Sequence, residues 1–258
     1  MTHSRTRVSL ALAALAVGAA APVATHAARV AKPTPRPGLY DRSGGAPAFR
    51  PTARSSWTAR LIAPTRLRLG PSSQAAFGAK LSADAPYAAG PQIFLVLDAQ
   101  KAADGGVWYR VLLPSRPNGA TGWVSGDLLA LRKNPWRVRV STARREAQLL
   151  RSGRVMNRWK VAVGRPSLPT PSGTFAISEI VPQGSPSGFY GPYIITLTAH
   201  SNQLNEFDGG DGRVALHGTS QPQFLGTAAS HGCVRLPNVA ANVIASRVPA
   251  GTPVEITP

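Results

Sequence analysis

Residues 230–236 read Ser-His-Gly-Cys-Val-Arg-Leu, and residues 216–219 read Leu-His-Gly-Thr. The first stretch holds Cys233, the only cysteine among the 258 residues of the chain. A lone cysteine can be a small buried hydrophobe. Cys233, however, stands close to His231 and Arg235 and not inside an apolar run. We therefore interpret Cys233 as a reactive thiol.

Two histidines could activate this thiol. A thiol with a pKa of about 8.5 is only a few per cent thiolate at pH 7, so a nearby imidazole is needed to remove the proton. His217 and His231 are both candidates, and in an extended segment His231 shares a face with Cys233. Gly218 and Gly232 let the backbone approach closely, so that backbone N–H groups could bind an oxyanion. The two stretches thus supply a nucleophile, a base and oxyanion donors.

The same side chains could instead hold a metal ion. Cys233, His217 and His231 would give zinc three ligands and one open position. No matching fourth ligand and no Cys-x-x-Cys spacing accompanies them in the sequence. We expect neither a metal nor another cofactor, because a thiol and an imidazole are sufficient for acyl transfer.

The residues around both stretches predict a domain of short strands between residues 132 and 258. Ser152-Gly153 separates two strand-like runs and is a hairpin signal. Residues 238–246 form the best helical stretch, with Asn238 as its N-cap. We expect a mainly β fold here, a twisted β-sandwich with one or two short helices. The predicted strands are 137–141, 146–151, 155–163, 173–177, 194–199, 214–216 and 254–256.

Residues 57–131 predict a second, smaller β unit. Its short strand candidates are separated by turn residues, which is typical of a small barrel or meander. The unit resembles bacterial SH3-like domains, which implies that it binds cell-wall peptide or braces a neighbouring domain. It contains no cysteine and no histidine, so we expect it to contribute no catalytic group. The segments that carry the resemblance are 67–72, 108–111 and 122–124.

The first 27 residues read as a secretory signal peptide. Arginines precede an uncharged run over residues 8–23, and residues 25–27 resemble a small-x-small cleavage site. The run is shorter than the roughly 20 residues that span a bilayer, so we expect no membrane span after cleavage. Residues 28–56 are rich in proline and arginine and predict an extended, solvated linker. Export to the bacterial cell envelope, either periplasm or cell wall, follows from this arrangement.

The composition limits the partners. Lys plus Arg number 29 and Asp plus Glu 11, a net charge of +18. The 25 glycines and 24 prolines exclude a coiled coil, and 43% hydrophobic residues argue against wholesale disorder. The charge would suit nucleic acid, but an exported protein rarely meets it. We expect no nucleic acid and favour an anionic polymer of the wall.

Taken together, the two stretches resemble the L,D-transpeptidase (YkuD-like) catalytic domain. The combination of residues 217–219 with residues 230–236 carries most of the resemblance. Flanking segments that also fit are 163–164, 170–175 and 251–256. The resemblance implies that Cys233 is the nucleophile and His217 its base. The backbone carbonyl of Gly218 would orient the imidazolium in place of a carboxylate.

The resemblance also implies supporting roles. Backbone N–H groups of Gly232 and Cys233 would form much of an oxyanion hole, and His231 would line the site. Ser230 is a further candidate for oxyanion or substrate binding. Arg235 would either hold a substrate carboxylate or brace the loop through an ion pair. Three aromatic residues are candidates for a substrate lid, although we favour core packing for them: Phe189, Tyr190 and Tyr193.

The implied reaction is peptidoglycan remodelling. The cysteine would attack the bond between the L-centre of a diamino acid and a terminal D-alanine, and D-alanine would leave a thioester behind. An amine of another stem peptide would then form a cross-link, whereas water would make the enzyme an L,D-carboxypeptidase. The sequence leaves both acceptors open. We further expect a monomer that carbapenem-type inhibitors acylate.

Other classes of protein explain less of the sequence. In NlpC/P60 endopeptidases the cysteine precedes the histidine, whereas here His217 comes first. Sortases carry a TLxTC-like strand, which residues 230–236 do not match. A non-catalytic wall-binding protein remains an alternative, but it leaves Cys233 and both histidines without a role.

Overall fold

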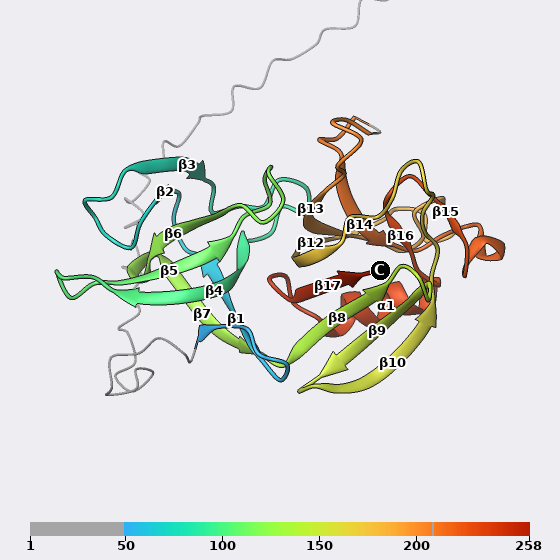
Figure 1. The fold of residues 1–258 in the computed structure, drawn as a ribbon, viewed down its shortest axis with the longest axis horizontal. Coiled ribbons are helices and arrows are strands. Elements are labelled where there is room, and N and C mark those ends of the chain that lie inside the picture. The colour runs from blue at the N-terminus through green and yellow to red at the C-terminus, as the bar shows by residue number, and fades with distance from the viewer. Residues whose placement is uncertain (1–48, 208) are drawn as a thin grey trace, which may run out of the picture. The chain divides into compact units, whose positions relative to one another are not determined.

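The computed structural model describes residues 49–207 and 209–258. The predicted signal peptide and residues 28–48 of the predicted linker lie outside the described residues. The described chain is mainly β, as predicted, and Figure 1 shows its strands. Among the helices of the described ranges, none is long and apolar enough to cross a membrane.

The first of two large sheets is formed by residues 56–134. Its seven strands lie in the order β3-β2-β6-β5-β4-β1-β7, and every pair is antiparallel. We call it the N-terminal sheet. Its resemblance to an SH3-like domain stays a prediction. The strands are β1 (Ser56–Leu61), β2 (Thr65–Arg68), β3 (Phe77–Leu81), β4 (Ile93–Lys101), β5 (Val107–Leu112), β6 (Thr121–Ser125) and β7 (Leu129–Asn134).

The structure differs from the predicted linker near residue 49. Phe49 is 1% exposed and belongs to the apolar core of the N-terminal sheet. Its ring lies 5.2 Å from the rings of both Trp57 and Tyr109. Burial of a Phe side chain contributes about 2 kcal/mol. Phe49 is therefore packed and not solvated, whereas Arg50, Thr52 and Arg54 of the same predicted linker are exposed.

The second large sheet contains eight strands in the order β10-β9-β8-β17-β12-β13-β14-β16. A β-bulge between Ile177 and Glu179 divides β12, whose first half pairs with β17 and whose second half pairs with β13. A two-stranded parallel sheet, β11-β15, is joined to its edge by an isolated bridge between Ala162 and Arg235. The strands are β8 (Trp136–Ser141), β9 (Glu146–Arg151), β10 (Arg154–Lys160), β11 (Val163–Gly164), β12 (Gly173–Pro182), β13 (Tyr193–His200), β14 (Arg213–His217), β15 (Ala228–Ser230), β16 (Val234–Arg235) and β17 (Pro253–Thr257).

The hairpin between β9 and β10 is confirmed. Ser152 and Gly153 have φ values of 51° and 82°, and the flanking strands pair antiparallel. Two central residues with positive φ are what a type I′ turn requires, and its twist matches that of the strands. This turn sets the register of β10 on β9.

One α-helix, α1 (Asn238–Arg247), packs against β13 and β14. Its apolar residues Ala240, Ala241 and Ile244 join the core that both halves of the sheet share. The predicted N-cap is wrong by one position, because Pro237 is the N-cap and Asn238 is the first helical residue. Short 3-10 turns at Gly126–Leu128 and Pro222–Phe224 complete the described helices.

The edge of the eight-stranded sheet brings the two sequence motifs together. β14 and β16 pair in parallel, with Leu216 opposite Val234 and His217 opposite Arg235. Cys233 is the residue immediately before β16. Residues far apart in sequence thus become neighbours through one short parallel ladder.

Candidate active site

Cys233 lies in a tight turn that joins β15 to β16. The hydroxyl of Ser230 donates to the Cys233 carbonyl oxygen at 2.5 Å and accepts from the Gly232 N–H at 3.1 Å. Gly232 has a φ of 122°, a conformation that favours glycine. The turn therefore holds Cys233 in place, and Ser230 serves the turn itself. The role of the Gly232 N–H toward an oxyanion stays a prediction.

The thiol of Cys233 is protonated at rest. Burial raises its pKa, while the Ala215 N–H, 3.4 Å from Sγ, and the charge of Arg235 oppose this to a smaller extent. Desolvation disfavours the thiolate more than one weak hydrogen bond to sulfur can favour it. A nucleophilic role for this thiol would therefore require an activating base.

His217 ends β14 and is only 3% exposed. Its Nδ1 lies 2.6 Å from the carbonyl oxygen of Gly218. Because a carbonyl only accepts, Nδ1 carries the proton and the lone pair of Nε2 is available. Burial lowers the pKa of His217 to about 4, against the hydrogen bond to Gly218, and the charge of Arg235 lowers it further. The imidazole is consequently neutral at pH 7, in the tautomer of a base.

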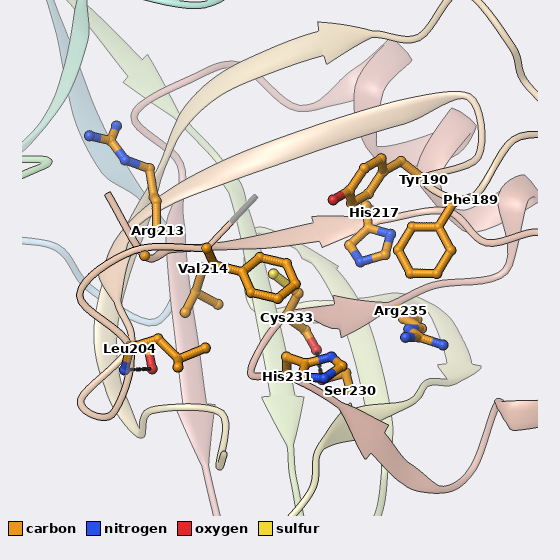
Figure 2. A pocket seen from close by; sticks show the side chains of 13 residues that line it. Phe189, Tyr190, Leu204, Arg213, Val214, His217, Ser230, His231, Cys233 and Arg235 are labelled. Atoms are coloured by element: carbon orange, nitrogen blue, oxygen red, sulfur yellow. Dashed lines mark hydrogen bonds between the residues drawn. The ribbon is translucent and has the colours of Figure 1, made fainter. Parts of the chain in front are cut away.

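Cys233 and His217 line the same two cavities, which meet between them. Figure 2 shows Cys233 near the centre of the view, with the ring of His217 to its right. Within the described residues no hydrogen bond joins Sγ to the imidazole. Catalytic hydrogen bonds often form only once substrate is bound. The larger cavity has a volume of about 240 Å³.

Two aromatic residues enclose the imidazole of His217. The ring of Phe189 is stacked 6.3 Å from that of His217, and the ring of Tyr190 meets it edge-on at 5.1 Å. Phe189 is 46% exposed and lines the pocket, so core packing is the wrong interpretation for it and for Tyr190. Tyr193 does pack against the core of the domain.

Arg235 lines the pocket and contacts residues next to it. It is 7% exposed, its Nη1 donates to Gln221 Oε1 at 3.1 Å, and its guanidinium lies 5.1 Å from the ring centroid of Phe189. No ion pair of Arg235 occurs in the described part of the chain. It therefore braces the neighbouring loop through an amide, and its charge acts on both His217 and Cys233.

His231 lies on the outer side of the pocket. It is exposed, and its ring is stacked 5.4 Å from that of Phe207. Phe207 belongs to the loop between β13 and β14 and lines both cavities. Sequence reasoning missed Phe207, because a single aromatic residue in a polar loop has no periodic pattern.

Asn238 has a role that differs from capping. Its Oδ1 accepts from the Thr219 N–H at 2.7 Å. The first residue of α1 thus fixes the segment that follows His217.

The described residues contain no group of three or more His, Cys, Asp or Glu side chains that could hold a metal ion.

Known proteins resemble the chain in sequence. A family model described as the L,D-transpeptidase catalytic domain, YkuD, matches residues 135–256. Two Bacillus proteins that are named L,D-transpeptidase YkuD are also similar to this chain in sequence. The protein of Bacillus subtilis (strain 168) is 30% identical over 161 residues, which cover 60% of this chain and 90% of that protein. The protein of Bacillus licheniformis is 34% identical over 124 residues, which cover 48% of this chain and 67% of that protein.

Solved structures also align with the chain. An L,D-transpeptidase from Mycobacterium tuberculosis H37Rv has a TM-score of 0.42 and 15% identity, over 68% of this chain and 93% of that one. The structure of LdtMt1 in complex with imipenem has a TM-score of 0.40 and 16% identity, over 59% of this chain and 91% of that one.

Proposed function

Because this chain belongs to the YkuD family of L,D-transpeptidases, we propose that it is an exported peptidoglycan L,D-transpeptidase that acts through a thioester on Cys233. The observation that carries the proposal is the buried His217, whose Nδ1 bonds the Gly218 carbonyl and whose side chain lines the same cavities as Cys233. A neutral, oriented imidazole beside a protonated thiol is the arrangement that general-base activation requires.

In the acylation step, Nε2 of His217 takes the proton of Cys233 while Sγ attacks the carbonyl carbon at the L-centre of the diamino acid. A carbon–sulfur bond forms, and the carbonyl oxygen becomes an oxyanion. The carbon–nitrogen bond to D-alanine then breaks, and the imidazolium gives its proton to the departing amine. The product is a thioester and free D-alanine.

The burial of His217 affects the timing of this proton transfer. Since burial disfavours both the imidazolium and the thiolate, the proton moves as the sulfur attacks and not beforehand. The Gly218 carbonyl stabilises the imidazolium that forms transiently, in the position where a triad has its carboxylate.

The backbone at residues 232 and 233 would receive the oxyanion. The positive φ of Gly232 turns the peptide group before Cys233, and the Ser230 hydroxyl keeps that turn closed. Backbone N–H groups fixed in this way stabilise charge without reorganising during the reaction.

In the second step an amine of another stem peptide attacks the thioester and forms an amide cross-link, and the thiol recovers its proton. Attack by water would release a tripeptide, which is the L,D-carboxypeptidase reaction. A carbapenem should react with the same thiol, since opening of its β-lactam ring is also acyl transfer.

The proposal is tested by incubating the full-length chain with a purified stem tetrapeptide and analysing the products by mass spectrometry. A cross-linked dimer with free D-alanine supports transpeptidation, and tripeptide alone supports the carboxypeptidase alternative. Neither product should form with Cys233→Ala. Unchanged tetrapeptide with the wild-type chain would contradict both readings and favour a non-catalytic role.

A further inference from the structure

The larger active-site cavity reaches the N-terminal sheet. It extends from Cys233 and His217 to Tyr87, a residue of the loop between β3 and β4. Tyr87 is 51% exposed, and the guanidinium of Arg213 lies 5.6 Å from its ring centroid. An aromatic side chain from the half without cysteine or histidine thus forms one wall of the cavity.

A buried carboxylate fixes this loop. Oε2 of Glu179, in β12, accepts the backbone N–H groups of Tyr87 at 2.9 Å and of Ala88 at 2.8 Å. Glu179 is only 3% exposed and lies at the bulge of β12. Hydrogen bonds to an ionised acceptor are about twice as strong as neutral ones. Glu179 therefore holds the backbone from which the Tyr87 ring projects.

In a second set of contacts, a side chain of the N-terminal half reaches the other half. Arg116 donates to the carbonyl oxygens of Ser201 and Leu204 at 2.8 Å and of Asp211 at 3.1 Å. These acceptors belong to the loop between β13 and β14, which also carries Phe207. Two walls of one cavity, at Tyr87 and at Phe207, are thus each held across the junction of the two sheets.

The junction itself is packed. Leu95 and Leu112 of the N-terminal sheet form a buried apolar cluster with Ala176 of β12. A Cβ atom placed on Gly251 would lie 2.8 Å from the carbonyl oxygen of Phe94. The two sheets are therefore in direct contact. That residues 57–131 position or brace the enzyme without a catalytic group stays a prediction, and Tyr87 adds to it a cavity wall from this half.

We propose that Tyr87 is a specificity-determining residue that contacts the donor stem peptide on the side preceding the diamino acid, and that Glu179 positions it. This inference rests on the proposed function. The departing D-alanine is a single residue, whereas the rest of the donor is a longer chain that needs the larger cavity. Its wall combines Tyr87 and Ile194 with the Asp211–Arg213 ion pair, which suits a chain of methylene groups and polar amides.

The test compares two reactions of the full-length chain. The first is turnover of a stem tetrapeptide, which has to occupy the cavity as far as Tyr87. The second is acylation of Cys233 by a carbapenem, which needs only the surroundings of the thiol. Tyr87→Ala should raise KM for the tetrapeptide roughly tenfold, with kcat and the carbapenem rate within about twofold of wild type. Tyr87→Phe should restore most of the loss.

Two further variants complete the design. Glu179→Gln should raise KM in the same direction and also spare the carbapenem reaction, because it acts through the loop. Phe77→Ala is the matched control, since Phe77 is 53% exposed on the same sheet and does not line the cavity. It should leave KM unchanged.

An unchanged KM in Tyr87→Ala, or an equal loss of both reactions, would overturn the role of Tyr87 while the proposed function stands. A wild-type chain that neither turns over tetrapeptide nor becomes acylated would overturn the proposed function and this inference with it.

Discussion

The imidazole Nδ1 of His217 lies 2.6 Å from the carbonyl oxygen of the next residue, Gly218. This contact between neighbours ties the orientation of the imidazole to its own backbone, and in the proposed mechanism it takes the place of the carboxylate of a triad. The geometry of Gly218 is in turn fixed by its surroundings, because Asn238 bonds the following N–H.

Gly218→Ala should slow acylation of Cys233 by roughly 10- to 100-fold, because small misplacements of a catalytic group carry penalties of that size. A Cβ on Gly218 would lie 2.8 Å from Cδ of Pro192 and would also meet Asn238 Oδ1, so the carbonyl has to shift. The rate of carbapenem acylation measures the effect. Gly184→Ala is the control, since no atom lies within 4 Å of a Cβ placed there. Equal rates for both variants would contradict this role for Gly218.

The protonation of Cys233 can be tested by alkylation. Since burial raises its pKa, iodoacetamide should react slowly at pH 7, with an inflection above the value of about 8.5 for a free thiol. A thiolate–imidazolium pair would instead react rapidly from about pH 5. The rate of alkylation between pH 5 and 10, followed by intact-protein mass spectrometry, separates the two. A fast plateau near pH 6 would refute the neutral resting state.

The low pKa of His217 predicts a loss of stability in acid. The ordinary histidine value of 6.5 applies to the unfolded chain, and the folded value is about 4. Between these values the unfolded state binds a proton that the folded state does not, so stability falls as pH falls. Protonation of His217 in the unfolded chain lowers the free energy of unfolding by about 3 kcal/mol at pH 4. Urea unfolding at pH 7 and pH 4.5 should show a smaller difference for His217→Asn than for wild type.

The sequence predicts the hairpin at Ser152-Gly153, and it predicts that Cys233 and His217 act together. Both predictions depend on local chemistry. A Ser-Gly pair between strand-like runs has few conformations available, and a lone thiol near histidines has few other uses. The predictions fail where a residue has two roles of similar energy. Asn238 suits an N-cap by type, yet its side chain accepts from Thr219 and leaves the cap to Pro237.

Contacts between the sheets carry no local signal at all. The carboxylate of Glu179 bonds the backbone of Tyr87 and Ala88, and backbone N–H groups are the same in every sequence. The position of Phe189 could not be predicted either. An exposed aromatic residue beside a histidine and an aromatic residue of the core look the same in a sequence. Only the fold brings these partners together.

The contacts of Arg116 predict a change in loop dynamics. Arg116→Ala removes three hydrogen bonds to backbone carbonyls of the loop between β13 and β14. Loss of roughly 1.4 kcal/mol of local stability would raise amide exchange in that loop about tenfold. Hydrogen–deuterium exchange measures this directly. Arg66→Ala, which loses bonds only to Gly78 within the N-terminal sheet, should leave the loop unchanged. Similar exchange in both variants would show that Arg116 does not hold the loop.

Single-turnover acylation by a carbapenem, followed by intact-protein mass spectrometry, tests whether Cys233 is acylated with His217 as its base. One adduct should form on Cys233 in the wild-type chain and none in Cys233→Ala. His217→Ala should slow the reaction by roughly 10²- to 10⁴-fold, and His231→Ala, whose exposed ring lines the outer side of the same pocket, should slow it less. An adduct that survives in Cys233→Ala, or an inactive His231→Ala beside a nearly normal His217→Ala, would contradict these roles.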